Sequence, residues 1–313
     1  MNNTNNPQLS SNLLMIRPCQ FFSNPQTAAS NKFQGRSKLS DVELQAAALN
    51  EFDLLVKNLR KQNINVIIFD DKPDSLTPDS VFPNNWVSFH RDGTVILYPM
   101  EAENRRLERR KDIIDTLKRD HDFNIKRIVD LSYFEDNHQY LEGTGSMILD
   151  HVNKIAYACL SSRTHQSVLL NFSEQMGFSL VTFTAKDSSG SDIYHTNVIM
   201  SVGEKIAVLC EDAIPAKSEK KHILDSLQNS GHEVVNISLD QMTSYAGNVL
   251  EVMSNNGEHH MLMSKRAEKS LSRKQKLTIE KYCGIISSPI ENIEDSAGGS
   301  VRCMMAEISL PKY

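Results

Sequence analysis

Residues 195–210 read HTNVIMSVGEKIAVLC and contain the pattern that decides the fold. A polar residue is followed by a short β-rich run, a turn at Val202-Gly203 and a second β-rich run, which is typical of a β-hairpin. Four other segments share this form, and they are 84–100, 142–160, 247–263 and 301–310. The chain therefore contains five related units.

The segments between these hairpins have apolar residues at helical spacing. They are 41–62, which Ser40 can cap at its N-terminus, then 104–119, 167–176, 216–228 and 265–282. Each of the last four precedes an isolated β-rich run, and these runs are 125–131, 178–184, 232–238 and 283–288. The repeated unit is therefore hairpin, helix and strand, or ββαβ.

One residue opens the inner strand of each unit, and these residues are Asn85, Glu142, His195, Asn248 and Cys303. They are separated by 57, 53, 53 and 55 positions. Periods near 50 residues are typical of propellers and other repeat folds. We therefore predict an α/β fold, a five-bladed propeller of pseudo-fivefold ββαβ repeats whose equivalent positions face a common axis. A stacked αβα sandwich is the alternative.

The composition fits one domain that binds a small molecule. The 313 residues are 40% hydrophobic, so we expect a single domain over 13–313 after a polar, disordered tail, 1–12. Neither a signal peptide nor a membrane span is expected. The net charge of −5 argues against a nucleic-acid or membrane surface, and the basic run 105–111 is interpreted as a solvated helix face. We expect a cytoplasmic protein, and a homodimer stays open.

The cysteines and adjacent histidines give little support for a metal site. The five cysteines include no C-x-x-C pair, which argues against a disulfide framework or a thiolate zinc site. His259 and His260 with Glu258 could serve a metal hydrolase, but adjacent histidines on a turn lack the spacing of a shared ligand face. We expect no metal and no other cofactor.

The remaining chemistry centres on Cys303, in the segment SAGGSVRCMMAEI. A thiol becomes a nucleophile when a nearby base favours its thiolate. His195 could carry the proton, and Glu142 could orient and stabilise the imidazole. Each residue alone more often has a structural role, but all three occupy equivalent points of one repeat. We therefore predict that Cys303, His195 and Glu142 are catalytic.

At these residues the sequence resembles the guanidine-modifying pentein superfamily of arginine deiminases, amidinotransferases and dimethylarginine dimethylaminohydrolases. PDSVFPNNWVSF, from Pro78, is similar to the dimethylaminohydrolase segment whose acidic residues bind substrate. LEGTGSMIL with CLSSRTH, YHTNVIMSVGEKIAVL and GGSVRCMM resemble the segments with the triad acid, the catalytic histidine and the nucleophilic cysteine. The resemblance implies these roles for Glu142, His195 and Cys303, and a carboxylate-binding role for Arg163.

Two positions depart from the family pattern. Deiminases grip guanidinium with an aspartate in the first segment and often with another two residues after the histidine, where this chain has Asn85 and Asn197. Burying a permanent cation without a carboxylate partner is costly, whereas an amide offers an acceptor and donors to a neutral ureido group. Succinylarginine dihydrolases show a similar pattern, and the overall likeness is greatest to a bacterial citrulline-utilisation hydrolase of this superfamily.

The resulting hypothesis is a cysteine-dependent hydrolase of a C–N bond in a ureido or guanidino group, converting citrulline to ornithine, carbon dioxide and ammonia through a covalent Cys303 intermediate. The predicted substrate-binding residues are Asn85, Asn197, Asp79, Arg163 and Asn248. Asp79 would bind the amino group, while Asn248 is in register with the pocket but could instead hold a turn. An arginine deiminase or amidinotransferase stays open, and so does a non-catalytic pentein binding protein.

Overall fold

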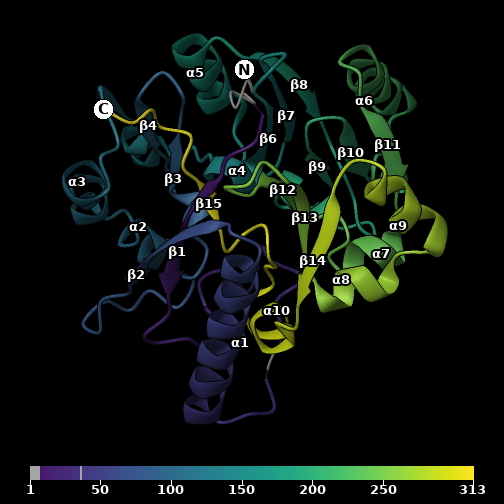
Figure 1. Cartoon of the computed structure of the whole chain (residues 1–313). Coiled ribbons are helices and arrows are strands. Elements are labelled where there is room, and N and C mark those ends of the chain that lie inside the picture. The colour runs from purple at the N-terminus through teal and green to yellow at the C-terminus, as the bar shows by residue number, and fades with distance from the viewer. Residues whose placement is uncertain (1–7, 36) are drawn as a thin grey trace.

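The computed structural model describes residues 8–35 and 37–313, whose strands form five separate three-stranded sheets (Figure 1). Each sheet has one antiparallel and one parallel strand pair, as hairpin-helix-strand units require. The α/β class is therefore confirmed, and the described strands do not form the continuous sheet of a stacked sandwich.

The sheets follow the chain, except that the first joins its two ends. The first contains β1 (Asn12–Arg17), β2 (Asn65–Asp70) and β15 (Ala306–Glu307), and the second β3 (Val87–Phe89), β4 (Thr94–Leu97) and β5 (Arg127–Asp130). The third contains β6 (Met147–Asp150), β7 (Ile155–Cys159) and β8 (Ser179–Phe183). The fourth contains β9 (Met200–Val202), β10 (Ile206–Leu209) and β11 (Glu233–Asn236), and the fifth β12 (Leu250–Met253), β13 (His259–Ser264) and β14 (Gly284–Ser288).

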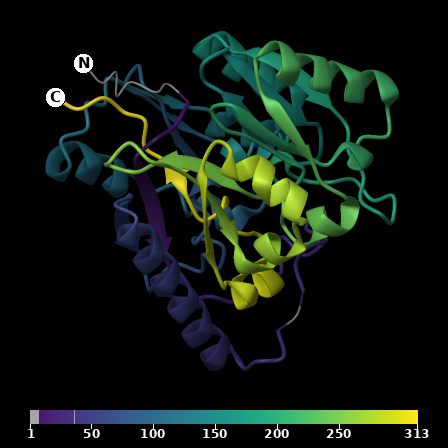
Figure 2. The same cartoon turned by 45° about the vertical axis from the view of Figure 1, so that its right-hand side comes forward.

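Helices cover the outside of the sheets. The longer ones are α1 (Asp41–Lys61), α3 (Lys111–Asp120), α5 (Gln166–Met176), α6 (Lys217–Asn229) and α9 (Arg273–Glu280), and they lie on the periphery (Figure 1). The shorter ones are α2 (Glu103–Arg106), α4 (Gly143–Ser146), α7 (Leu239–Thr243), α8 (Lys265–Ser270) and α10 (Glu291–Ala297). Figure 2 shows α1 beside α10, which it contacts. None of the helices in this described part of the chain is long and apolar enough to cross a bilayer.

Two predicted helices are divided. The segment 104–119 forms α2 and α3, and 265–282 forms α8 and α9. In the second case Ser272 accepts the backbone N–H of Gln275, and the Gln275 side chain accepts the N–H of Ser272. This capping box begins a new helix within a pattern that looked continuous.

Buried apolar clusters join each sheet to its neighbours. One contains Leu14 of β1 with Val87 of β3, another Ile96 of β4 with Met147 of β6, and a third Met200 of β9 with Met261 of β13. A fourth cluster joins the fifth sheet back to the first. Each sheet is therefore packed against others through buried apolar side chains.

The predicted disordered tail, 1–12, is wrong for its final residues, while 1–7 lie outside the described part. Gln8 and Ser10 are buried, and Asn12 begins β1. The Gln8 amide donates to the carbonyl oxygens of Leu149 and Val202 at 3.0 and 3.2 Å. The polar composition was misleading because this side chain satisfies backbone groups of the third and fourth sheets.

Candidate active site

The residues expected to open inner strands instead lie on short turns just before those strands. Asn85 ends a 3-10 turn (Pro83–Asn85), Glu142 precedes α4, and His195 precedes a second 3-10 turn (Thr196–Val198). Cys303 lies in a turn ahead of β15, where its N–H donates to the carbonyl of Ser300 at 2.9 Å. Equivalent turns of four sheets therefore present these four side chains.

His195 and Glu142 form the predicted acid–base pair. His195 Nε2 lies 2.8 Å from Glu142 Oε2, and both side chains are buried. Because an ionised carboxylate can only accept, Nε2 is assigned the proton that it donates. The Nδ1 atom of the imidazole is then left as the base.

The glycine motif after Glu142 is explained by close packing around the imidazole. A Cβ atom at Gly145 would lie 2.8 Å from His195 Nδ1 and 2.3 Å from Asn85 Nδ2. A glycine is therefore needed for the ring and the amide to approach the backbone together. The motif lets Asn85 and His195 both lie close to Gly145.

Opposing electrostatic effects fix the charges of this pair. Burial alone would raise the pKa of Glu142, but Arg163, whose Nη1 lies 3.3 Å away, and His195 hold it well below its usual range. Burial lowers the pKa of His195 to about 4, against the opposing effect of Glu142. The resting pair at neutral pH is a carboxylate and a neutral imidazole.

The Cys303 sulfur contacts two side-chain amides. Its Sγ accepts N–H groups from Asn197 Nδ2 and Asn248 Nδ2, each at 3.2 Å, and the side chain is 5% exposed. Cys303 and His195 line one narrow pocket with three other predicted residues, Asp79, Asn85 and Arg163. The structure therefore brings together all eight predicted site residues, with Glu142 in contact with His195, and Asn197 and Asn248 in contact with Cys303.

Arg163 does not lie free for a ligand. Besides Glu142, it pairs with Glu101 at 3.2 Å, and its Nη2 donates to Ser30 Oγ at 2.7 Å. Its guanidinium carbon also lies 4.8 Å from the centre of the Tyr194 ring. The predicted carboxylate-binding role is untested by these contacts.

Arg105 lines the pocket and was missed, because the run 105–111 was interpreted as a solvated helix face. It is 2% exposed and donates to both carboxylate oxygens of Glu108, at 3.0 and 2.9 Å, and to Asn85 Oδ1 at 3.0 Å. A signal was present, since arginine and glutamate three residues apart on a helix can be buried as a pair. Burial of the pair is the reason that the solvated-face interpretation is wrong here.

Two buried acceptors in this region have no hydrogen-bond partner among the described residues. They are Asp79 Oδ1 and Asn197 Oδ1. The other Asp79 oxygen accepts from Asn24 Nδ2 at 2.7 Å, and burial raises the pKa of this carboxyl. Buried acceptors usually have partners, so these two atoms indicate where N–H donors of a ligand would bind.

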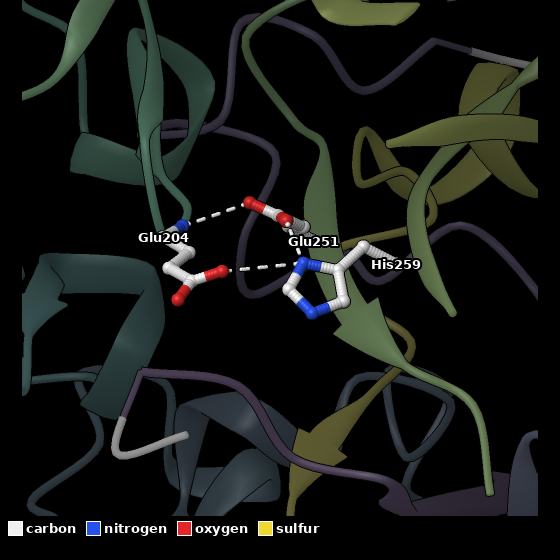
Figure 3. A group of neighbouring side chains, drawn as sticks. All are labelled: Glu204, Glu251 and His259. Atoms are coloured by element: carbon white, nitrogen blue, oxygen red, sulfur yellow. Dashed lines mark hydrogen bonds and ion pairs between the residues drawn. The ribbon is translucent and has the colours of Figure 1, made fainter. Parts of the chain in front are cut away.

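A second histidine cluster lies outside this pocket (Figure 3). The ligand atoms of Glu204, Glu251 and His259 lie within 4.8 Å of one another, the one such group of three in the described ranges. His259 Nδ1 is 3.1 Å from Glu251 Oε1 and 3.3 Å from Glu204 Oε2. This cluster contains His259 but neither His260 nor Glu258, the other two residues considered for a metal hydrolase. The ion pairs of His259 with Glu204 and Glu251 explain why the three side chains lie together.

Comparison with known proteins gives the family. Over residues 17–310 the sequence matches the family model described as N,N dimethylarginine dimethylhydrolase, eukaryotic. The chain belongs to this family. It therefore belongs to the guanidine-modifying pentein superfamily, as the resemblance predicted. No curated protein matches the chain.

Several solved structures share the fold. The substrate-bound N-terminal domain of ArgZ, an arginine dihydrolase from the ornithine-ammonia cycle in cyanobacteria, has a TM-score of 0.72 at 16% identity, covering 96% of this chain and 98% of that chain. Unliganded AgrE has a TM-score of 0.73 at 15% identity, over 96% of this chain and 40% of that one. A variant of a dimethylarginine dimethylaminohydrolase, as an adduct with S-methyl-L-thiocitrulline, has a TM-score of 0.62 at 14% identity, covering 95% of this chain and 99% of that chain. The chain spans 41% of the longer ArgZ chain.

Proposed function

We propose that the chain is a cysteine-dependent hydrolase of a C–N bond in a ureido or guanidino group, with citrulline as substrate and ornithine, carbon dioxide and ammonia as products. The supporting observation is the 2.8 Å His195–Glu142 bond beside a pocket that Cys303 also lines. Membership of the dimethylarginine hydrolase family and the similarity to ArgZ, an arginine dihydrolase, support the same reaction class.

In the first step the Cys303 thiol gives its proton to His195, which is neutral at rest, and the sulfur bonds to the ureido carbon. The resulting imidazolium is stabilised by Glu142 and passes its proton to the δ-nitrogen of the substrate. The C–N bond then breaks, releasing ornithine and leaving a carbamoyl group on the sulfur.

In the second step water attacks the carbamoyl carbon while His195 takes a proton from the water. The S–C bond breaks and carbamate leaves, and the sulfur recovers the proton from His195. Carbamate decomposes to ammonia and carbon dioxide, so one citrulline and one water give ornithine, ammonia and carbon dioxide.

The polar groups around the pocket match a neutral planar group with an amino-acid tail. Asn197 Oδ1 lacks a partner and would accept a ureido N–H, while Asn85 Nδ2 would donate to the ureido oxygen. Asp79 Oδ1 would accept from the substrate amino group. Arg163 lines the pocket and would bind the α-carboxylate by exchanging its contacts to Glu101 and Ser30 for the substrate.

An arginine substrate is the second candidate, and Asp79 is the observation that favours it. Asp79 lines the pocket, and its unpartnered carboxylate oxygen could pair with a guanidinium. Deimination would give citrulline, whereas amidino transfer would need a second amine. Product analysis separates these reactions from citrulline hydrolysis.

The test is ammonia release from citrulline, arginine, agmatine and succinylarginine by purified protein, with ornithine and citrulline measured as products. We expect citrulline to be consumed fastest and Cys303→Ser to be inactive. Faster deimination of arginine would overturn the assignment of the asparagines. If none of these compounds is consumed, but citrulline slows the labelling of Cys303 by a thiol reagent, the chain is a non-catalytic binding protein.

We also propose that the five sheets are blades of one closed propeller. The support is that apolar clusters join successive sheets and that β15, from the C-terminal end, pairs with β1. An experimental structure with five blades around one axis would confirm the closure, and an open arrangement would contradict it.

A further inference from the structure

The Asn248 side chain is the most completely engaged polar group beside Cys303. Its Nδ2 donates to Cys303 Sγ at 3.2 Å and to the carbonyl of Asn197 at 3.1 Å. Its Oδ1 accepts the backbone N–H of Arg302 at 3.1 Å. The residue is 1% exposed, so it is held by the nucleophile, by the residue before the nucleophile and by a turn of the fourth sheet.

Two backbone groups fix which end of this amide faces the sulfur. A backbone N–H can only donate, so the atom facing Arg302 must be the amide oxygen. A backbone carbonyl can only accept, so the atom facing Asn197 must be the amide nitrogen. The N–H directed at Cys303 therefore does not depend on an arbitrary choice between oxygen and nitrogen.

The neighbouring glycine explains how Asn248 reaches this place. A Cβ at Gly247 would lie 2.3 Å from the carbonyl oxygen of Val198 and 3.0 Å from the carbonyl carbon of Ile199. Only a residue without a side chain lets the fifth-sheet segment lie this close to the fourth-sheet turn. The close approach puts the Asn248 amide between Asn197 and Cys303.

Asn197 and Asn248 differ in what remains available for a ligand. Both donate to Cys303, but Asn197 keeps a buried oxygen without a partner, whereas both ends of the Asn248 amide are occupied. A substrate could bind Asn248 only by breaking bonds that hold the nucleophile turn. The earlier interpretation of Asn248 as a substrate ligand is therefore the weaker one.

We propose that Asn248 is a positioning residue that holds the Cys303 sulfur and stabilises its thiolate, and that it does not bind substrate. A thiolate accepts hydrogen bonds far better than a thiol, so two amide donors directed at one sulfur favour the anion. The catalytic consequence rests on the proposed function, but the state of the sulfur does not and can be measured without substrate.

The experiment compares wild type with Asn248→Asp. The carboxylate keeps the acceptor for the Arg302 N–H but loses the donor to sulfur and places a negative charge beside it. We expect the rate of Cys303 alkylation by iodoacetamide at pH 7.5, followed by mass spectrometry of its peptide, to fall about tenfold or more. With substrate, kcat should fall while KM changes less than about threefold.

Asn236→Asp is the matched control, because the Asn236 Oδ1 also accepts a backbone N–H, that of Glu211 at 3.2 Å, but the residue is exposed. In this variant the rate of Cys303 alkylation and kcat should equal those of wild type. Asn248→Ser, which keeps a hydroxyl donor in a smaller side chain, serves if Asn248→Asp does not fold, and an intermediate alkylation rate is expected.

A folded Asn248→Asp or Asn248→Ser variant whose Cys303 is alkylated at the wild-type rate would overturn the proposal. A raised KM with an unchanged kcat would also overturn it, because that result identifies Asn248 as a substrate ligand. If neither variant folds, the pH dependence of Cys303 alkylation in wild type decides, and a midpoint at or above the ordinary thiol value of about 8.5 would overturn the proposal. Slowed alkylation in a protein that consumes none of the four substrates would refute the proposed function and leave the role of Asn248 intact.

Discussion

Two of the histidine–glutamate pairs among the described residues have opposite electrostatic settings. His195 contacts Glu142 at 2.8 Å in the Cys303 pocket, and His259 contacts Glu251 at 3.1 Å between the fourth and fifth sheets (Figure 3). Burial lowers the pKa of His195 to about 4, whereas the hydrogen bond that His259 donates to Glu251 raises the pKa of His259.

The surroundings of each pair account for the difference. Arg163 and Arg105 lie 3.3 and 3.8 Å from Glu142, so its negative charge is shared with two cations. His259 instead has a second carboxylate, Glu204, and its side chain is 23% exposed. A neutral imidazole can take a proton from a thiol, which suits the His195 pair to act as a base. Carboxylates on two sides of His259 favour its imidazolium form, which suits that pair to a structural ion pair.

The largest effect expected from this comparison is on turnover. Glu142→Gln should lower kcat about 10³–10⁴-fold, the scale observed when a triad carboxylate is replaced, because the imidazolium loses its stabilising charge. Glu251→Gln should leave kcat within about twofold. Steady-state kinetics checks both, with thermal unfolding to confirm folding, and equal losses in the two variants would remove the distinction.

The second-largest expected effect is on stability at acid pH, where the His195 pair should lower the free energy of unfolding. A folded-state pKa of about 4 for His195 means that the unfolded chain binds more protons between that value and the ordinary pKa near 6.5. Stability is therefore lost as pH falls through this window. His195→Gln should reduce this loss by on the order of 2 kcal/mol in urea unfolding. A variant with the same pH dependence as wild type would contradict the lowered pKa.

Adding a carboxylate to the catalytic pocket should make it resemble the second cluster. Asn85 Nδ2 lies against the His195 ring, so Asn85→Asp places a negative charge near the imidazole and the bound ureido group. We expect the ratio of kcat/KM for arginine to that for citrulline to rise about tenfold. An unchanged ratio would mean that residue 85 does not discriminate between charged and neutral substrates.

The smallest effect concerns the second pair. The raised pKa of His259 contributes stability that is fully present below pH 6.5 and is lost as pH rises through the folded-state value. The free energy of unfolding lost in Glu251→Gln should be larger at pH 6 than at pH 8.5, by less than about 1 kcal/mol since the pair is partly exposed. The opposite pH trend would show that the assigned direction is wrong.

Much of the fold and site could be predicted because the repeat puts equivalent positions at equivalent places. The spacing predicted one such residue for each sheet, and each of the five lies just before an edge strand of its sheet, namely Asn85, Glu142, His195, Asn248 and Cys303. The spacing could not show that they lie on turns before the strands, since local hydrogen bonds such as that from the Cys303 N–H decide this.

What sequence reasoning missed depends on contacts between distant segments. Arg105 was interpreted as solvated because its neighbours are basic. Its burial follows from contacts with Glu108, in the turn after α2, and with Asn85 in another segment. Gln8 was assigned to a disordered tail because only the fold brings the carbonyls of Leu149 and Val202 to its amide. Such partners are set by tertiary packing and leave no local pattern.

The central claim is that Cys303 becomes covalently carbamoylated beside the Glu142–His195 pair. The direct measurement is rapid acid quenching during turnover of citrulline labelled at the ureido carbon, followed by mass spectrometry of the peptide that contains Cys303. The account predicts labelled carbamoyl on that sulfur, formed in wild type and absent in Cys303→Ser. A Cys303→Ser protein that still hydrolyses citrulline at the wild-type rate, with no labelled peptide in either protein, would contradict it.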